Sequence, residues 1–409
     1  MVEPAREYQV HARKETMKIT SVETIQLTTM PYLVFVRIGT DAGITGTSDT
    51  YYTTDGIRGF VHQDAAPVLL GADPFRVEAL WDQLHTHHMA RWGGIGMEMR
   101  ALSAIDVALW DIRAQALEVP IYQLLGGLVR DSIQTYNTCA GPMYGLAGFS
   151  RAGEGKTKLD DLWAQNNEPA KLAEDLLSQG ITAMKIWPFD RFALASGGKR
   201  ITAQEIEDGL RPFREIRAAV GNSIDIMLDG HGYWNLAAAK DIASAVEEFS
   251  PAWLEDLIIP NDIDTLLELK QSTRAPIVAS EMLVTRFQYR QLLERRAADI
   301  VMIDPTWAGG ITESKKIIAL AEAFGRPVTM HDCTGPFTML AGLHLSVSAP
   351  TAIFQESLRA YLATWYPGLT TIDLRIEGGR IHAPTKNGIG AELRPEVLSR
   401  DDVVRQVSE

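Results

Sequence analysis

Six short apolar runs, each ending in an acidic residue or a histidine, decide the fold of this chain: IDIMLD (224–229), WLE (253–255), IVASE (277–281), IVMID (300–304), VTMH (328–331) and IFQE (353–356). A seventh run, ITAMKIW (181–187), precedes them, and amphipathic helical stretches separate the runs. Strands that alternate with helices pair in parallel through right-handed crossovers. Eight such units, the first beginning near Ile133, close into a barrel. An open doubly wound sheet is the competing arrangement, but it usually has a glycine-rich turn after its first strand, and residues 133–142 contain none.

The residue that ends each of the six runs is polar, and these residues are evenly spaced along the chain. They are Asp229, Glu255, Glu281, Asp304, His331 and Glu356. Successive members lie 23 to 27 residues apart, which corresponds to one strand–helix unit. Because the carboxyl ends of all strands in such a barrel point to the same mouth, we expect the six side chains to converge on one site.

Three of these residues, Asp229, Glu255 and Glu281, are predicted metal ligands. Three carboxylates brought together without a cation would repel one another and raise one or more of their pKa values. A hard divalent cation removes this conflict, and an all-oxygen ligand set with room for water and substrate suits Mg²⁺. The sequence therefore predicts a Mg²⁺ cofactor.

The other polar positions suggest acid–base chemistry. Asp304 and His331 end neighbouring strands, so the carboxylate can hold the imidazole in one tautomer and increase its basicity. His231, two residues after a predicted ligand, is expected on the same side of its strand, as a general acid or a substrate contact. Lys185 is expected to neutralise a substrate carboxylate. Glu356 is expected to be protonated and to donate a hydrogen bond, which with Lys185 and the metal would stabilise a doubly charged enediolate.

The amino-terminal region has a different pattern. Residues 17–60 alternate with period two and break at Asp41-Ala42-Gly43, which predicts a meander of antiparallel strands, and a helical period begins near Pro74. A strand block followed by a helix block predicts a separate α+β domain. The predicted organisation is a disordered leader at 1–16, an α+β domain at 17–132, the barrel at 133–358 and a carboxyl-terminal segment at 359–409.

Composition limits the class of protein. The chain has 409 residues, of which 46% are hydrophobic and 22% charged, and its formal net charge is −13. An acidic balance without a Lys/Arg stripe argues against a nucleic-acid partner, and no apolar run is long enough for a membrane span. The two cysteines cannot form a disulfide framework, and residues 1–16 lack the apolar core of a signal peptide. These features predict a cytoplasmic protein.

From residue 17 onward the chain resembles the enolase superfamily, mandelate racemase subgroup. The helical part of that family's capping domain is similar to SAIDVALWDIRAQALEVPIYQLLGG (103–127). Three stretches resemble the family's metal-ligand strands: LDGHGYWN (228–235), WLEDL (253–257) and SEM (280–282). Two resemble the strands of its His–Asp dyad, IDPTWAGGITE (303–313) and MHDCTG (330–335), and FQES (354–357) resembles its last strand. The resemblance implies a modified TIM barrel, (β/α)7β, with an α+β capping domain formed by the amino-terminal region and the carboxyl-terminal tail. It also implies an even-numbered homo-oligomer.

One departure from the family pattern bears on the reaction. The family often has Lys-x-Lys at the second strand, where the second lysine acts on the opposite face of the substrate, whereas here the stretch is Lys185-Ile186-Trp187. A racemase with a Lys/His pair of bases is therefore disfavoured. The Asp229-Gly230-His231 stretch is similar to the Asp-x-His arrangement of acid-sugar dehydratases in the subgroup.

The resemblance thus implies a Mg²⁺-dependent hydro-lyase that dehydrates a sugar acid, an aldonate or aldarate. His331 would take the C2 proton to give a metal-stabilised enediolate, and His231 or protonated His331 would assist loss of the C3 hydroxyl, giving a 2-keto-3-deoxy acid. The alternatives are a racemase, epimerase or cycloisomerase that uses the same enediolate, or a non-catalytic ligand-binding barrel. The sequence does not choose the sugar acid or its stereochemistry.

Substrate contacts are expected from loops at the barrel mouth. The predicted contacts are Lys185, Trp187, Tyr52, Arg91 and Trp307. Further candidates from the capping segments and the tryptophans are Tyr51, His87, His88, Trp92 and Trp234. The stretches 141–159 and 190–200 are candidates for extra loops at the same mouth.

Overall fold

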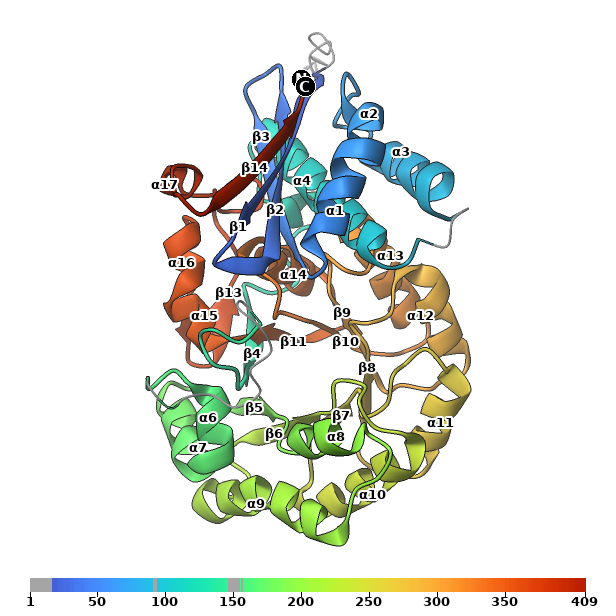
Figure 1. The fold of residues 1–409 in the computed structure, drawn as a ribbon, viewed down its shortest axis with the longest axis vertical. Coiled ribbons are helices and arrows are strands. Elements are labelled where there is room, and N and C mark those ends of the chain that lie inside the picture. Colours follow the sequence, from blue (N-terminus) through green and yellow to red (C-terminus); the bar gives the residue numbers. More distant parts are fainter. Residues whose placement is uncertain (1–16, 91–93, 146–154, 156) are drawn as a thin grey trace, which may run out of the picture.

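The computed structural model describes residues 17–90, 94–145, 155 and 157–409. The predicted leader at 1–16 lies outside these residues. A sheet of four antiparallel strands in the order β14-β1-β2-β3 forms the top of the molecule in Figure 1. Its strands are β1 (Ile19–Leu27), β2 (Met30–Thr40), β3 (Thr45–Tyr51) and β14 (Val403–Ser408). The predicted turn at 41–43 joins β2 to β3, and β14 brings the carboxyl terminus back to β1.

Helices pack against this sheet and complete the capping domain. They are α1 (Thr54–Phe60), η1 (Val61–Ala65), α2 (Ala66–Leu69), α3 (Val77–Asp82), η2 (Gln83–Met89), α4 (Met97–Ala116) and α5 (Ile121–Leu124). Helix α4 is buried along most of its length, because it lies between the sheet and the barrel helix α13. The predicted α+β capping domain, with both chain ends contributing, is confirmed.

Eight parallel strands form the closed barrel seen in the centre of Figure 1. They are β4 (Ser132–Thr138), β5 (Ala183–Ile186), β6 (Asp225–Asp229), β7 (Trp253–Glu255), β8 (Ile277–Ala279), β9 (Ile300–Ile303), β10 (Val328–Met330) and β11 (Ala352–Ser357). Pairing of β11 with β4, in which Glu356 lies opposite Tyr136, closes the ring. A small cluster that includes Tyr136, Met227 and Trp253 fills the barrel interior. The predicted barrel is confirmed.

Helices surround the barrel and explain why its strands are apolar on both faces. They are α6 (Asp161–Asn167), α7 (Pro169–Ser178), α8 (Asp190–Ser196), α9 (Ala203–Val220), α10 (Leu236–Val246), η4 (Glu247–Phe249), α11 (Ile263–Gln271), α12 (Thr285–Glu294), α13 (Gly310–Ala323) and α14 (Pro336–Ser348). A capping box between Thr202 and Glu205 starts α9. The expectation of a loop at 190–200 is wrong, because α8 occupies most of that stretch.

The carboxyl-terminal segment joins the sheet of the capping domain only with its last strand. It contains α15 (Arg359–Ala363), α16 (Trp365–Leu369), β12 (Ile376–Glu377), β13 (Arg380–His382) and α17 (Pro395–Leu398) before β14. Strand β13 pairs antiparallel with β4, so this part of the tail belongs to the barrel wall.

Buried carboxylates of the capping domain join it to the barrel. Asp49 on β3 accepts hydrogen bonds from the backbone N–H groups of Phe337 (2.8 Å) and Thr338 (3.0 Å) in the first turn of α14. Asp111 on α4 accepts from the N–H groups of Thr47 and Ile389. The Asp49 contacts satisfy backbone donors in the first turn of α14, which have no intrahelical partner, and they hold the capping domain against this barrel helix. The Asp111 contacts tie α4 to β3 and to the carboxyl-terminal segment.

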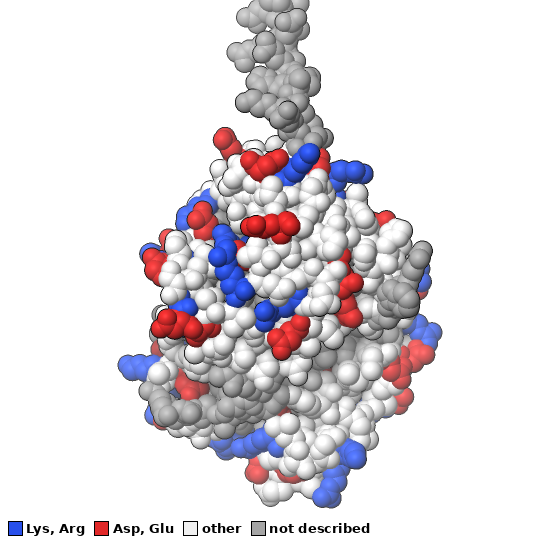
Figure 2. Space-filling model, turned by 45° about the horizontal axis from the view of Figure 1, so that its top comes forward, with Lys and Arg blue, Asp and Glu red and all other residues white. Residues whose placement is uncertain are grey.

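Figure 2 shows lysine, arginine and acidic side chains interspersed on the face it presents. Among the helices of the described residues, none combines the length and apolar character needed to span a bilayer.

Candidate active site

A cavity of about 510 Å³ opens at the carboxyl ends of the barrel strands, beneath the capping domain. Its volume is in the range of small-molecule sites. It is lined by Tyr51, Tyr52, Arg100, Thr138, Tyr144, Lys185, Trp187, Asp229, His231, Tyr233, Glu281, Met282, Trp307, His331, Cys333 and Glu356. Two other predicted residues, Glu255 and Asp304, lie buried just behind this wall, in contact with Lys185 and His331 respectively. The structure therefore brings the predicted polar residues to one place.

Lys185 lies at the centre of the acidic residues. Its Nζ is 2.5 Å from Glu255 Oε1, 2.9 Å from Glu356 Oε1 and 3.1 Å from Asp229 Oδ2, and the side chain is 2% exposed. Burial alone would lower the pKa of Lys185, but the surrounding carboxylates raise it well above its usual value. The lysine therefore stays charged and holds three strand ends together.

The three predicted metal ligands are crowded. Burial raises the pKa of Glu255 well above its usual value, and repulsion from Asp229, Glu356 and Glu281 adds to this effect although Lys185 opposes it. Glu281 Oε2 is buried and has no hydrogen-bond partner among the described residues. In the described part of the chain, no three acidic, histidine or cysteine side chains form a ready metal cluster, and Lys185 lies among the carboxylates. The set nonetheless offers an uncompensated oxygen to a cation.

His331 and Asp304 form the predicted pair. His331 Nδ1 lies 2.8 Å from Asp304 Oδ2, and Asp304 also accepts hydrogen bonds from Thr306 and Thr334. The imidazole Nε2 is 4.0 Å from Glu356 Oε2. Burial opposes the charged imidazole, but Glu356, Asp304 and Glu281 outweigh it and raise the pKa of His331 to about 10.

His231 has a carboxylate partner that the sequence analysis missed. Its Nδ1 lies 2.8 Å from Asp190 Oδ2, at the start of α8, and its Nε2 lies 3.7 Å from Asp229 Oδ2. Burial lowers the pKa of His231, but Asp229 and Asp190 raise it to about 9. Asp190 follows the Lys185 strand by only a few residues, and that was the one signal that could have identified it.

The path of the chain to His231 also differs from the expectation. Strand β6 ends at Asp229, and His231 lies beyond it in a turn with φ 47°, between two glycines. Its backbone N–H donates to Asp229 Oδ1 at 2.9 Å. The side chain reaches the mouth through this left-handed turn and not through strand alternation.

The expectation that Glu356 is protonated is wrong. Burial would raise the pKa of Glu356, but Lys185, His331 and a hydrogen bond from Thr138 lower it below its usual value. Its second oxygen accepts the backbone N–H of Asp332 at 2.9 Å. An ionised Glu356 acts as an acceptor that fixes Lys185, and it is not a donor to substrate.

The predicted substrate contacts divide into three groups. Tyr52, Trp187 and Trp307 line the cavity, as do Lys185 and Tyr51. Arg91 and Trp92 lie outside the described residues, as does most of the stretch 141–159. His87, His88 and Trp234 are not among the residues that line the cavity. Arg100 on α4 lines it and was missed, because a single arginine within a helical pattern gives no sign of the direction in which it points.

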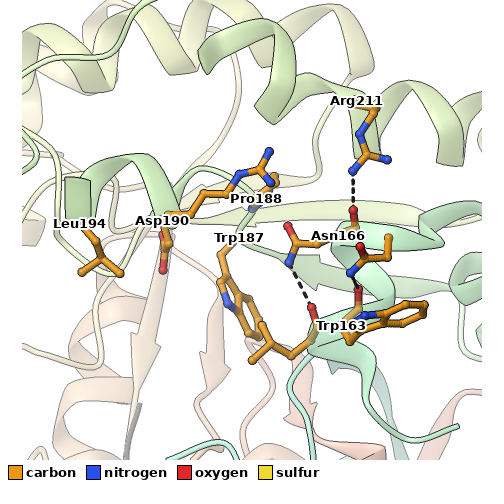
Figure 3. A pocket seen from close by; sticks show the side chains of 10 residues that line it. Trp163, Asn166, Trp187, Pro188, Asp190, Leu194 and Arg211 are labelled. Carbon is orange, nitrogen blue, oxygen red and sulfur yellow. Dashed lines mark hydrogen bonds between the residues drawn. The ribbon is translucent and has the colours of Figure 1, made fainter. Parts of the chain in front are cut away.

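Trp187 separates this cavity from a second one. The outer cavity, about 440 Å³, is shown in Figure 3 and lies between α6, α8 and α9. Trp187 lines both cavities, and its ring is perpendicular to that of His231 at 5.5 Å between centroids. The tryptophan that replaces the second lysine of the family pattern therefore serves as a wall beside His231.

Two family models match most of the chain. Residues 7–126 match the mandelate racemase / muconate lactonizing enzyme N-terminal domain, and residues 168–397 match the enolase C-terminal domain-like family. The chain belongs to the enolase superfamily, mandelate racemase subgroup. The predicted family is thus confirmed.

Relatives in the subgroup cover nearly the full chain. D-galactonate dehydratase of Ralstonia pickettii is 31% identical over 388 residues, 92% of each chain. The D-galactonate dehydratase of Xanthomonas axonopodis pv. citri is 31% identical over 94% of each chain. A mandelate racemase subgroup enolase from Agrobacterium tumefaciens is 38% identical with a TM-score of 0.85, over 96% of this chain and 99% of that one. A putative dehydratase from Salmonella is 28% identical with a TM-score of 0.87, over 96% of this chain and all of the other.

Proposed function

We propose that this protein is a Mg²⁺-dependent dehydratase that converts a sugar acid to a 2-keto-3-deoxy acid. One observation carries the proposal: two histidines, His231 and His331, line the same cavity, and each has a carboxylate at its Nδ1. Elimination of water needs one group to remove a proton from carbon and another to protonate the leaving hydroxyl. Full-length relatives that are named dehydratases support the same reaction type.

Each residue then has a defined task. His331, oriented by Asp304, takes the C2 proton on Nε2, while Lys185 contacts the substrate carboxylate, where negative charge develops. His231, oriented by Asp190, gives a proton to the C3 hydroxyl, which leaves as water. The resulting enol takes a proton at C3 and becomes the 2-keto group, so that the net change is loss of one water.

The residues present fit a divalent cation. The predicted ligands Asp229, Glu255 and Glu281 offer only oxygens, which is the donor set that Mg²⁺ prefers, and Glu281 Oε2 has no other partner among the described residues. Bound there, Mg²⁺ would supply positive charge to the carboxylate end of the substrate. It would also offset the negative charge that raises the pKa of His331, so that the imidazole could accept a proton near pH 7.

The test is a screen of aldonates and aldarates with Mg²⁺, followed by detection of a 2-keto-3-deoxy product. We expect at least one acid to give this product, and chelation of the metal to stop the reaction. Absence of product from every mono- and diacid would refute the proposed dehydration.

A second candidate is an epimerase or racemase, favoured by the presence of an acid–base histidine at each of two positions in the cavity. In that case His231 would return a proton to C2 from the opposite face. Incubation in deuterated water distinguishes the two reactions, because epimerisation gives deuterium at C2 of recovered acid and no keto product. An even-numbered homo-oligomer and a cytoplasmic location stay predictions, to be tested by sedimentation and by cell fractionation.

A further inference from the structure

Arg100 is a cation of the cavity without a carboxylate partner. It projects from α4 of the capping domain, and its Nη1 donates to the backbone oxygen of Tyr51 at 3.0 Å. Its guanidinium carbon lies 3.5 Å from the ring centroid of Trp307. Among the described residues, no Asp or Glu oxygen lies within 4.0 Å of its nitrogens. The guanidinium is therefore held in place by a carbonyl and an indole, with most of its five N–H donors left for another partner.

The two buried Lys and Arg cations among the described residues, Lys185 and Arg359, are paired with carboxylates. Lys185 contacts three carboxylates, and Arg359, 6% exposed, contacts Asp161 at 2.6 Å and Asp175 at 2.5 Å. Taking a charge out of water without a counter-charge is costly. Burial lowers the pKa of Arg100 to about 10, although the negative charges of Asp304 and Glu281, which are not in contact with it, oppose this effect. An anionic ligand in the cavity would remove this cost.

The position of Arg100 shows which end of a ligand it would meet. Lys185 lies on β5, and Trp307, on which Arg100 stacks, follows β9. In the closed order β4 to β11 these two strands are four apart, so they stand on opposite sides of the eight-stranded ring. A sugar acid with its C1 carboxylate at Lys185 and its C2 beside His331 would extend toward Arg100 with its far end.

We propose that Arg100 binds a second carboxylate at the far end of the substrate, so that the preferred substrate is an aldarate and not an aldonate. The inference rests on the proposed dehydration and deepens it. A guanidinium matches a carboxylate through two parallel N–H donors, and a primary alcohol at the same place cannot neutralise the charge.

The experiment compares matched acids that differ only at C6, such as galactarate and D-galactonate, together with other aldarate and aldonate pairs. For the wild-type protein we expect kcat/KM for the preferred aldarate to exceed that of its matched aldonate by about 100-fold. Arg100→Gln is expected to lower kcat/KM for the aldarate by about 100-fold, mainly through KM, and to change that for the aldonate by less than about 3-fold. Arg76→Gln, which removes an exposed charge of the same domain, is the control and should change neither.

The outcomes separate the two proposals. Dehydration of aldonates with equal or higher kcat/KM would overturn the assignment of Arg100 and leave the dehydratase standing. An equal loss for both substrates in Arg100→Gln would do the same, because Arg100 would then bind a group that the two acids share. If Arg100→Gln does not fold, two measurements still test whether Arg100 binds a second carboxylate. They are the comparison of aldarate and aldonate with the wild-type protein, and the same comparison with Arg100→Lys, which keeps the charge but loses the two parallel N–H donors. Absence of any dehydration would instead refute the reaction itself.

Discussion

The protein contains two groups of buried carboxylates with opposite surroundings. In the capping domain, Asp49 and Asp111 accept hydrogen bonds from backbone N–H groups with both of their oxygens. At the barrel mouth, Glu255 and Asp229 share Lys185 with a third carboxylate, and Glu281 keeps one oxygen without a partner among the described residues. Both groups are removed from water, but only the second is left with electrostatic conflict.

The pKa values express the same contrast. Burial raises the pKa of Asp49 to about 7, while hydrogen bonds from Thr338 and Phe337 lower it. For Glu255 burial also comes first, but several neighbouring carboxylates raise the pKa further. Backbone donors offset part of the cost of burying a carboxylate. Neighbouring like charges increase that cost, which is the reason for the proposed cation there, and the difference lies in the neighbours and not in the residue type.

The largest expected effect is at the mouth. His331→Asn should leave folding and Mg²⁺ binding intact but reduce exchange of the C2 proton by about 1,000-fold or more, because the proposed general base is lost. Exchange measured by NMR in deuterated water is the readout. His382→Asn, an exposed histidine of β13, is the control. Undiminished exchange in His331→Asn would remove it as the base.

At Asp49 of the capping domain the expected loss is in stability and not in catalytic activity. Asp49→Ala leaves the N–H groups of Phe337 and Thr338 without their acceptor, and should lower the free energy of unfolding by about 3 kcal/mol. Denaturant unfolding measures this. Asp55→Ala, at a side chain that is 95% exposed, should change it by less than about 0.5 kcal/mol. A lowered Mg²⁺ affinity in folded Asp49→Ala would contradict the separation of the two groups.

Glu255→Gln tests a carboxylate at the barrel mouth, where like charges surround it. The variant should bind Mg²⁺ about 100-fold more weakly, because a charged oxygen ligand is replaced by an amide. Isothermal titration with Mg²⁺ gives the affinity, and Glu268→Gln, a surface glutamate paired with Lys240, is the matched control. An affinity equal to that of the wild type would take Glu255 out of the ligand set.

Asp190→Asn sharpens the comparison between the two His–Asp pairs. The amide no longer stabilises a protonated His231 ring, so kcat for dehydration should fall about 10-fold with little change in KM. Asp208→Asn on α9, where the carboxylate accepts a hydrogen bond from the exposed Gln204, serves as control. The positioning role of Asp190 fails if KM alone changes, or if the melting temperature falls in proportion to activity.

The last expected effect is at a buried histidine far from the mouth. His344 on α14 accepts the N–H of Tyr122 and donates to the oxygen of Ile389, and burial lowers its pKa to about 4. Unfolding therefore takes up a proton between about pH 6.5 and pH 4, so that stability is complete above pH 6.5 and falls as the pH falls.

Comparison with His344→Gln isolates this contribution. The difference in unfolding free energy between wild type and variant should decrease on acidification by up to about 1.4 kcal/mol per pH unit within that window, and stay constant above pH 7. A difference that is independent of pH from 4 to 7 would show that His344 titrates normally in the folded state.

The sequence was sufficient for the strands and for the residues at their ends. Runs such as WLE and VTMH are apolar because the strands are covered on both faces, and regular spacing places Glu255 and His331 at one mouth. The same reasoning could not find Asp190, which follows its strand in a segment taken for a loop. It also assigned Glu356 the wrong protonation state, since that depends on how closely Lys185 and His331 approach.

By itself the sequence determined the order of elements, the barrel and the set of side chains at its carboxyl edge, because period and spacing are local properties of the chain. Only the tertiary structure decided which buried acids are satisfied, which histidine has which carboxylate, and that Arg100 of α4 reaches into the cavity. These features depend on distances between residues that are as far apart in the sequence as Arg100 and Trp307, which are in contact in the structure. Electrostatic interactions change steeply with such distances, and no pattern along the chain encodes them.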